Sequence, residues 1–274
     1  MKKKLSIALL CTLIICIFSG CSKLDQLQVK MGMKNTDFDY MKQGNIKQIV
    51  IQNTRDQGFC FIVSDPKAIM EIYDILSTAK PVSTKSSLKP DYIFKITDSS
   101  GKEYQFNYIA GLDKKDGGNL YNDSNIYVVS GRIDTDIIQI FGEDVRKPPK
   151  DFSELYYKFI LQALDKYRQS NDKAGTVGID INNDVEIGKY ILSTDLDDFK
   201  KSLPSNTQLL ESQDQNTDIV ESIVTQGYKW DLYKAEITFK DKKNNTEVKY
   251  YLVYSYDSKS GWSEKLDTTK PKDF

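Results

Sequence analysis

The sequence predicts an α+β fold made of two tandem modules behind an N-terminal tether. Three observations favour it. Segments with helical spacing of apolar residues lie between short runs whose apolar residues alternate as in strands. Several of these strands flank turns rich in Asp, Asn, Ser and Gly, which is typical of hairpins. The two halves also share apolar and turn residues at a constant offset of 130 residues.

The first module is predicted over residues 45–147. Strands at 46–52 and 59–63 come first, and Asp65-Pro66 then begins a helix, with Asp as N-cap and Pro at the first helical position. A hairpin follows, with strands at 92–97 and 103–109. A strand at 127–130 and a short helix at 133–141 end the module. The segment 147–150, Lys-Pro-Pro-Lys, predicts a stiff linker.

The second module is predicted over residues 151–274. Asp151 and Glu154 have the spacing of a capping box and begin the longest helix, which has a wide apolar face up to Tyr167. Strands are expected at 177–181 and 190–192, helices at 196–203 and 218–226, and a closing hairpin at 235–240 and 248–256.

An internal duplication is predicted from the shared offset. Ile49 matches Ile179, Gly58 matches Gly188, and the cap Asp65 matches Asp195. We therefore expect two related units of strand, strand, helix and hairpin. Chance similarity between two amphipathic runs is the alternative.

The N-terminus has the pattern of an export signal. Three lysines at positions 2–4 precede an apolar run from Leu5 to Phe18, which is too short for a comfortable membrane span. Ser19-Gly20-Cys21 follows. This segment resembles the lipobox of bacterial lipoproteins, although Phe18 stands where leucine is usual. The resemblance implies cleavage of residues 1–20, lipidation of Cys21 with acyl chains such as palmitate, and a tether over 21–44.

The composition indicates where the protein works. It is rich in Lys, Asn, Ile, Tyr and Asp and poor in Ala and Trp, a style that resembles clostridial and other low-GC Gram-positive proteins. We therefore expect a lipid-anchored protein on the outer face of the plasma membrane. With residues 1–20 removed, 35 basic residues face 39 acidic ones, so a dedicated nucleic-acid binder with a strongly basic balance is disfavoured.

Several catalytic chemistries are excluded by residue type. The chain has no histidine, which removes Ser-His-Asp triads, Cys-His pairs and His-ligated zinc. Cys60, the only cysteine left after processing besides Cys21, lies in an apolar run and is predicted to be a buried core thiol. We expect no enzyme and no cofactor. A weak calcium site in the acidic loop 113–123 is an alternative to a solvated loop.

Two basic segments are candidates for binding a polyanion. In the C-terminal hairpin, lysines are interleaved with tyrosines and with Trp230 and Trp262; a second basic run lies in the first module. Aromatic rings stack on bases and lysines neutralise phosphates. The alternative is an ordinary hairpin with one packed aromatic face and solvated lysines. The candidates are Lys240, Lys242, Lys243, Lys249, Tyr250, Tyr254 and Tyr256 in the hairpin, and Lys85, Lys89 and Lys95 in the first module.

The expected function is therefore non-enzymatic binding at the cell surface. Size and composition resemble clostridial surface lipoproteins linked to biofilm formation, some of which bind DNA. That resemblance implies extracellular DNA or an anionic wall polymer as the ligand. The alternative is an accessory or sensory lipoprotein that contacts a membrane sensor or transporter. Salt dependence would distinguish the two, because polyanion binding weakens steeply as salt rises.

Overall fold

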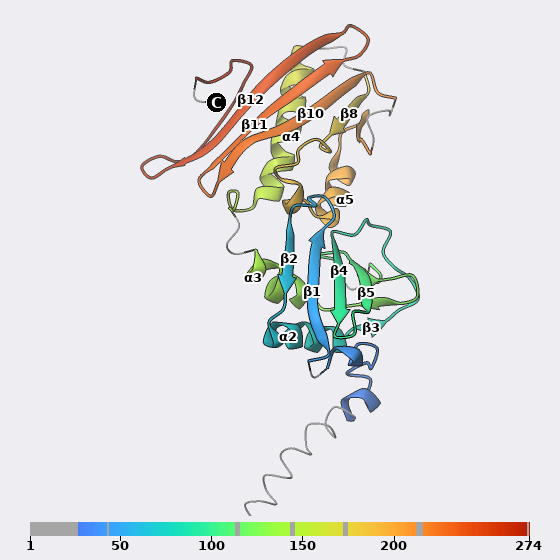
Figure 1. Cartoon of the computed structure of the whole chain (residues 1–274). Coiled ribbons are helices and arrows are strands. Elements are labelled where there is room, and N and C mark those ends of the chain that lie inside the picture. Colours follow the sequence, from blue (N-terminus) through green and yellow to red (C-terminus); the bar gives the residue numbers. More distant parts are fainter. Residues whose placement is uncertain are drawn as a thin grey trace, which may run out of the picture.

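The computed structural model describes residues 27–42, 44–112, 116–142, 146–171, 175–211, 216–272 and 274. These residues form two β-sheets with helices packed on them, so the predicted α+β class is confirmed (Figure 1). The export signal and Cys21 lie outside the described residues. Within those residues, no helix combines the length and the apolar character needed to cross a membrane.

The first sheet has the strand order β2-β1-β4-β5-β6-β7-β3. Its strands are β1 (Ile46–Asn53), β2 (Cys60–Val63), β3 (Lys80–Pro81), β4 (Tyr92–Asp98), β5 (Glu103–Tyr108), β6 (Leu120–Tyr121) and β7 (Ile126–Val128). All its neighbouring strands are antiparallel. Inward residues of β1 and β4, such as Ile49, Ile51 and Phe94, are buried in one core with the helices.

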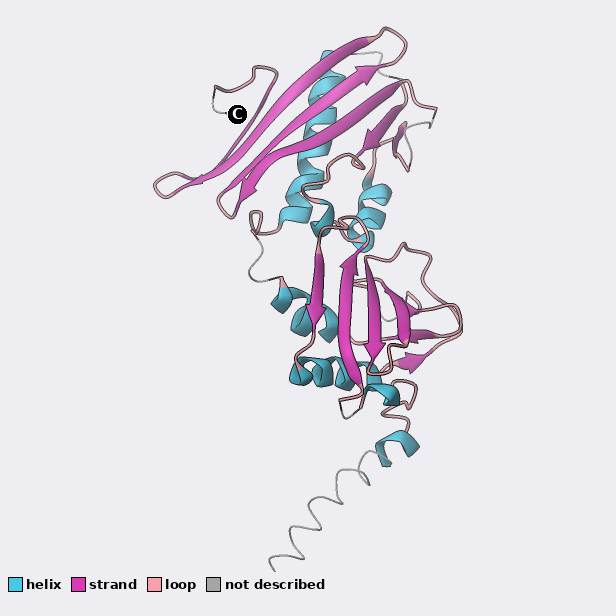
Figure 2. Ribbon diagram, viewed as in Figure 1, coloured by secondary structure: helices cyan, strands magenta, loops and turns pink. Residues whose placement is uncertain are grey.

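Helices cover one face of this sheet (Figure 2). They are η1 (Asp39–Met41), α2 (Pro66–Ser77), the π-helix η2 (Ile133–Ile138) and α3 (Gln139–Phe141). The carboxylate of Asp65 accepts hydrogen bonds from the backbone N–H groups of Lys67 and Ala68, both at 3.0 Å, which satisfies two donors at the N-terminus of α2. The predicted cap and first helical position are therefore confirmed for α2.

The second sheet has the order β13-β12-β11-β10-β8-β9. Its strands are β8 (Val177–Asp180), β9 (Thr207–Leu209), β10 (Ile219–Lys229), β11 (Leu232–Asp241), β12 (Thr246–Asp257) and β13 (Gly261–Asp267). Strands β8, β9 and β10 are mutually parallel, and β10 to β13 form an antiparallel meander.

Two helices, α4 (Phe152–Ser170) and α5 (Ser193–Ser202), accompany this sheet, with the short η3 (Gly188–Tyr190). The apolar face of α4 packs on the long strands, where the ring of Tyr167 stacks on that of Phe239 at 4.3 Å between centroids. Phe159 and Ile160 of the same face are fully buried. The second sheet therefore has a core of its own.

Three element predictions in the second half are wrong. Residues 190–192 form no strand, because the chain turns through η3 before α5. Residues 218–226 belong to β10, whose side chains alternate between buried and exposed, with Ile219, Glu221, Ile223 and Thr225 inside. A buried glutamate on the inner face hid that alternation. Asp151 has φ of 57° and makes no side-chain cap hydrogen bond, so the predicted capping box is absent.

The prediction for Cys60 is also wrong, because its thiol is exposed. Strand β2 is a four-residue edge strand, and only Val63 of it is buried. Alternation along the strand places Cys60 and Ile62 on the outer face. The apolar run that predicted a core strand thus has two exposed side chains, those of Cys60 and Ile62.

The two halves do not repeat the same strand pairing. In the first sheet β1 pairs with β4 antiparallel, whereas its counterpart β8 pairs with β10 parallel. The second half has one strand before its helix rather than two. The α+β class holds for both halves, but a repeated strand–strand–helix unit is not seen.

Candidate functional site

A buried ion pair joins the two halves. Asp91, at the start of β4, is fully buried, and its carboxylate accepts a hydrogen bond from the guanidinium of Arg55 at 2.6 Å. The same carboxylate accepts the backbone N–H of Ser193, at the start of α5, at 2.8 Å. Arg55 also donates to the Ser193 hydroxyl. The Arg55, Asp91 and Ser193 groups therefore satisfy one another's hydrogen-bonding capacity at the boundary between the halves.

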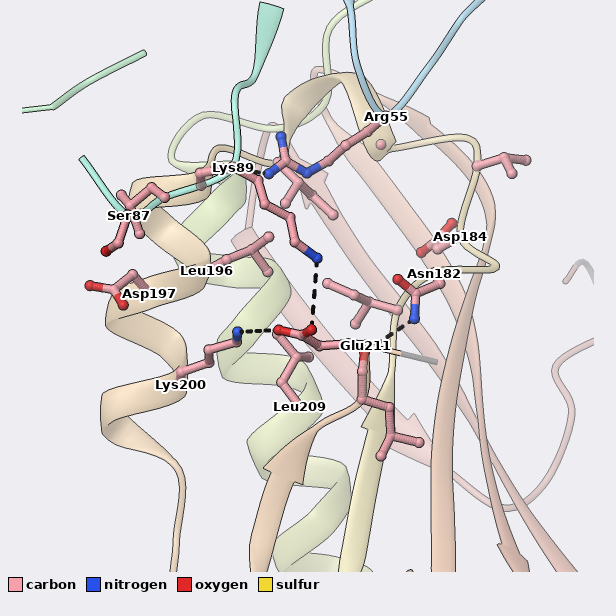
Figure 3. Close-up of a pocket in the computed structure, with 17 residues that line it drawn as sticks. Arg55, Ser87, Lys89, Asn182, Asp184, Leu196, Asp197, Lys200, Leu209 and Glu211 are labelled. Atoms are coloured by element: carbon pink, nitrogen blue, oxygen red, sulfur yellow. Dashed lines mark hydrogen bonds and ion pairs between the residues drawn. The ribbon is translucent and has the colours of Figure 1, made fainter. Parts of the chain in front are cut away.

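A cavity of about 390 Å³ lies beside this ion pair, between the halves (Figure 3). The first half contributes the turn after β1 and the segment before β4, and the second contributes the loop after β8, helix α5 and the end of β9. Its lining is part apolar, from leucines at 88, 196, 209 and 210, and part charged. A cavity at a boundary between two packed units is a common place for a ligand.

The charged lining holds three cations, Arg55, Lys89 and Lys200, and three acids, Asp184, Asp197 and Glu211, and both lysines lie close to Glu211. Glu211 lies 3.3 Å from the ammonium group of Lys200 on α5 and 3.9 Å from that of Lys89 in the first half. Figure 3 shows the Lys89 side chain reaching toward it from above and the Lys200 side chain from α5 at the left. These three side chains are about half exposed or more, so solvent screens the pairs and each contributes little to stability. The carboxylate is therefore held weakly between two cations.

Asp184 marks the inner end of the cavity. It is buried and accepts hydrogen bonds from the backbone N–H and hydroxyl of Thr225, at 3.0 and 2.8 Å, and from the hydroxyl of Tyr156 at 3.2 Å. Burial raises the pKa of Asp184 to about 6, against the opposing effect of these hydrogen bonds. Because Tyr156 lies on α4 and Thr225 lies on β10, these hydrogen bonds to Asp184 hold the loop after β8 against both elements.

The arrangement fits binding of an anionic group. A phosphate or carboxylate of a ligand would meet Lys89 and Lys200 where Glu211 now lies, and the leucines would contact its apolar part. Such a site gains from charge-assisted hydrogen bonds. A ligand anion would have to displace the Glu211 carboxylate from its two solvent-screened ion pairs. Arg55 is committed to Asp91 and Ser193, so it positions the site rather than presenting a charge to the cavity.

The predicted hairpin residues are spread along the second sheet rather than gathered. Lys240, Lys242 and Lys243 lie at the turn between β11 and β12, at the end of the sheet far from the first half (Figure 1). Lys249 is paired with Glu236 at 2.8 Å and Glu247 at 3.4 Å.

The predicted tyrosines differ in exposure. Tyr250 is only 5% exposed and packs edge-on against Phe239, so it cannot stack on a base. Tyr254 packs on the core, and Tyr256 is exposed at the other end of β12 from the lysine turn. The lysines and tyrosines that alternate in the sequence therefore do not form one surface. A strand rises about 3.3 Å per residue, so residues at its two ends lie far apart.

Of the predicted lysines in the first half, only Lys89 lines the cavity. Lys85 lies over the ring of Tyr121 at 4.8 Å. Lys95 faces outward on β4, in a cross-strand row with Val50 and Ile62. The ten candidate residues are thus distributed over at least three surfaces.

Three residues of this site, namely Arg55, Lys200 and Glu211, were not identified from the sequence. Lys200 lies in α5, Glu211 follows β9, and Arg55 lies in a turn 138 residues before Ser193, its partner. Charged residues in such places usually face solvent. No local signal marks them, because the cavity forms only when the two halves meet.

Metal binding finds no support in the described part of the chain, where no group of three or more Cys, Asp or Glu side chains is placed to hold an ion. Asp113 of the candidate calcium loop lies outside the described residues. Polar residues also alternate at positions 180, 182, 184 and 186. Asp180 there accepts hydrogen bonds from Asn182 and Asn183 and so orders its own turn.

Comparison with known proteins gives one similarity. No curated protein and no solved structure matches the chain. A family model described as YhfM protein matches residues 42–147, a segment that contains all seven strands of the first sheet and its helices α2, η2 and α3. The first half of this chain is therefore similar to the YhfM protein family.

Proposed function

We propose that this chain is a lipid-anchored, non-enzymatic binding protein on the outer face of the plasma membrane. Two features support the proposal. The lipobox-like segment ending at Cys21 supports the anchor. The cavity between the halves, with Glu211 between Lys89 and Lys200, supports binding of an anionic ligand.

The ligand we propose is an extracellular polyanion, with DNA of a biofilm matrix as the first example. The carrying observation is the position of Glu211, because its carboxylate occupies the place that a backbone phosphate would take between two lysines from different halves. An exposed lysine pair neutralises phosphates irrespective of base sequence. The lysine turn between β11 and β12 would add a more distant contact to a long polymer.

Fluorescence anisotropy of a labelled DNA duplex, titrated with residues 22–274, tests the proposal. We expect binding that weakens steeply between about 50 and 200 mM salt. The double variant Lys89→Ala/Lys200→Ala should weaken binding at least tenfold and reduce the salt slope by about two, since each lysine releases about one counterion.

Two variants serve as comparisons. Lys67→Ala removes an exposed lysine on α2, away from the cavity, and should leave affinity within about twofold. The triple variant Lys240→Ala/Lys242→Ala/Lys243→Ala should reduce affinity less than the double variant. No binding at low salt would overturn the DNA proposal, and loss only in the triple variant would overturn the cavity as its site.

The anchor has a separate test. Cys21→Ala should release the protein from the membrane fraction of expressing cells, because the lipid on Cys21 would be its attachment. A variant that stays equally membrane-bound would contradict the lipoprotein assignment. A conservative change in the tether, such as Ser22→Ala, should leave the protein in the membrane fraction.

A membrane protein partner is the second candidate ligand, favoured by the outer face of the first sheet. Ile62 there is 66% exposed and pairs across strands with Val50 and then Lys95. None of the described helices covers this face (Figure 2). A packed protein interface would depend little on salt, and Ile62→Ser would weaken it while leaving DNA affinity unchanged.

A common origin of the two halves stays a hypothesis. The 130-residue offset that suggested it also carries β4 (Tyr92–Asp98) and β5 (Glu103–Tyr108) onto residues 222–228 and 233–238, which lie within β10 and β11. The different pairing of β1 and β8 speaks against it. A structure of a relative with intermediate strand pairing would support it, and the binding proposal does not depend on it.

A further inference from the structure

Three aromatic rings are exposed together at one end of the second sheet. Trp230 is 66% exposed, and Tyr256 and Trp262 are each 42% exposed. The ring centroids of Trp230 and Tyr256 are 6.3 Å apart, and those of Tyr256 and Trp262 are 5.4 Å apart. We call these three side chains the aromatic platform.

The platform is built from two neighbouring turns. Trp230 lies in the two-residue turn between β10 and β11, while Tyr256 and Trp262 are register partners beside the turn between β12 and β13. Figure 1 shows both turns at the same end of the sheet, opposite the turn between β11 and β12. The aromatic platform is therefore separate from the cavity around Glu211 and from the lysine turn.

The core holds the platform in place. The ring of Trp262 stacks on Tyr254 with centroids 4.5 Å apart and planes within 4°, and Tyr254 packs on the fully buried Phe159 of α4. Strand β13 is tied to α4 by the ion pair of Lys158 with Glu264 at 2.9 Å, and by the hydrogen bond from Lys166 to the carbonyl of Leu266.

The adjoining turn is ordered too. The carboxylate of Asp257 accepts the backbone N–H groups of Lys259 and Ser260. Rings held in this way lose little conformational freedom when a ligand stacks on them. One face of Trp262 is covered by Tyr254, so a ligand would meet the other.

The charge around the aromatic platform is balanced. The turn before β11 contributes Lys229 and Asp231, and the turn before β13 contributes Asp257 and Lys259, so each turn is formally neutral. A polyanion gains nothing from such a surface, and a membrane surface rich in anionic lipid gains little. In the turn beside Tyr256 and Trp262, the hydroxyl of Ser260 donates a hydrogen bond to the carboxylate of Asp257 at 3.2 Å, so uncharged and charged hydrogen-bonding groups border the rings.

We propose that the aromatic platform binds an uncharged glycan by stacking sugar rings on Trp230, Tyr256 and Trp262. The C–H groups of a pyranose face carry partial positive charge and meet the negative face of an aromatic ring favourably. The planes of Trp230 and Tyr256 are inclined by 48° and those of Tyr256 and Trp262 by 60°, so the successive sugars of a chain would stack on rings of different orientation. The aromatic platform is a different surface from the cavity around Glu211, so glycan binding here is independent of DNA binding there.

Tryptophan fluorescence gives a direct test, because Trp230 and Trp262 are the only tryptophans in the chain. Residues 22–274 are titrated with chitohexaose and with cellohexaose, at low and at high salt. We expect a saturable change in fluorescence for at least one of them that is unaffected by salt. Isothermal titration calorimetry on the same samples measures the affinity independently of the fluorophores.

Substitutions then locate the site. Tyr256→Ala keeps both tryptophans and should weaken glycan binding at least tenfold, as should Trp230→Ala and Trp262→Ala by calorimetry. Val224→Ala, at an exposed position on β10 outside the aromatic platform, is the matched control and should bind as the parent chain does. Circular dichroism shows whether each variant keeps its fold.

Other outcomes would overturn the proposal. No binding of either hexasaccharide, or binding that survives all three platform substitutions, excludes a glycan site here. Binding of neutral phosphatidylcholine vesicles without sugar binding would show a lipid-facing platform. Binding of oligo-dT that the same substitutions abolish, without sugar binding, would show a nucleic-acid platform. A platform-dependent dimer without sugar binding, seen by sedimentation, would show a contact between copies.

Discussion

At the level of single residues, two carboxyl groups are buried although acidic side chains usually face solvent. Asp184 and Glu221 both lie inside the second sheet's core, where desolvation raises the pKa of each. Asp184 has three hydrogen-bond donors, whereas neither side-chain oxygen of Glu221 has a hydrogen-bond partner among the described residues. A raised pKa means that the folded protein disfavours the charged form.

Asp184 should make stability fall as pH rises. Its pKa is about 6 in the folded chain and 3.8 for an ordinary aspartate, so well below pH 3.8 both states are protonated and no penalty arises. Between pH 4 and pH 6 the unfolded chain ionises first, and folding loses up to about 3 kcal/mol from this group. Above pH 6 the penalty stays constant.

Urea unfolding at pH 4 and pH 7 measures this effect. Asp184→Asn keeps an acceptor for Thr225 but cannot ionise, so the variant should lose less stability between the two pH values than the parent chain by about 2 kcal/mol. Asp180→Asn, in a turn beside it, is the comparison variant. An identical pH dependence in parent and Asp184→Asn would contradict the assignment.

At the level of elements, local sequence chemistry succeeded where the signal is local. The Asp65-Pro66 pair predicted the start of α2, and the hairpins at β4–β5 and β11–β12 were predicted within a few residues. Short strands that depend on partners, such as β3, β6 and β9, carry too few residues for a periodic signal. Strand β10 was predicted as a helix because Glu221 interrupts its apolar alternation.

The two aspartates that precede helices should respond differently to substitution. Asp65→Ala removes two hydrogen bonds to the N-terminus of α2 and should lower stability by about 1 kcal/mol. Asp151 precedes α4 with φ of 57° and makes no cap hydrogen bond, so Asp151→Gly should cost nothing and relieve the left-handed backbone. Thermal unfolding of both variants checks this. Equal losses would refute the difference in capping.

At the level of the whole molecule, the buried pair of Arg55 and Asp91 connects the halves. Its guanidinium–carboxylate distance of 2.6 Å equals that of the exposed pair of Arg132 and Asp136. The two ion pairs thus have the same length but differ in burial. The Asp91 side chain is fully buried, whereas the Asp136 side chain is 38% exposed. Only the first pair reaches across to Ser193 of α5.

Truncating each arginine should separate the two cases. Arg55→Ala leaves a buried carboxylate without its cation and should cost about 3–5 kcal/mol. Arg132→Ala breaks a solvent-screened pair and should leave the free energy of unfolding nearly unchanged. Urea titration of both variants at neutral pH gives the comparison. A loss below 1 kcal/mol for Arg55→Ala would show that Asp91 finds other partners and that the pair does not hold the halves together.

The sequence by itself determined the features that depend on neighbours along the chain. These are the α+β class, the cap of α2, the two hairpins and the lipobox-like pattern at Cys21, because periodicity, turn chemistry and short motifs are local properties. Tertiary structure decided which side chains meet. The cavity around Glu211, the Arg55–Asp91–Ser193 contact and the aromatic platform each join residues from different elements, and in the first two from different halves. Burial and pairing of that kind follow from packing, which no spacing along the chain encodes.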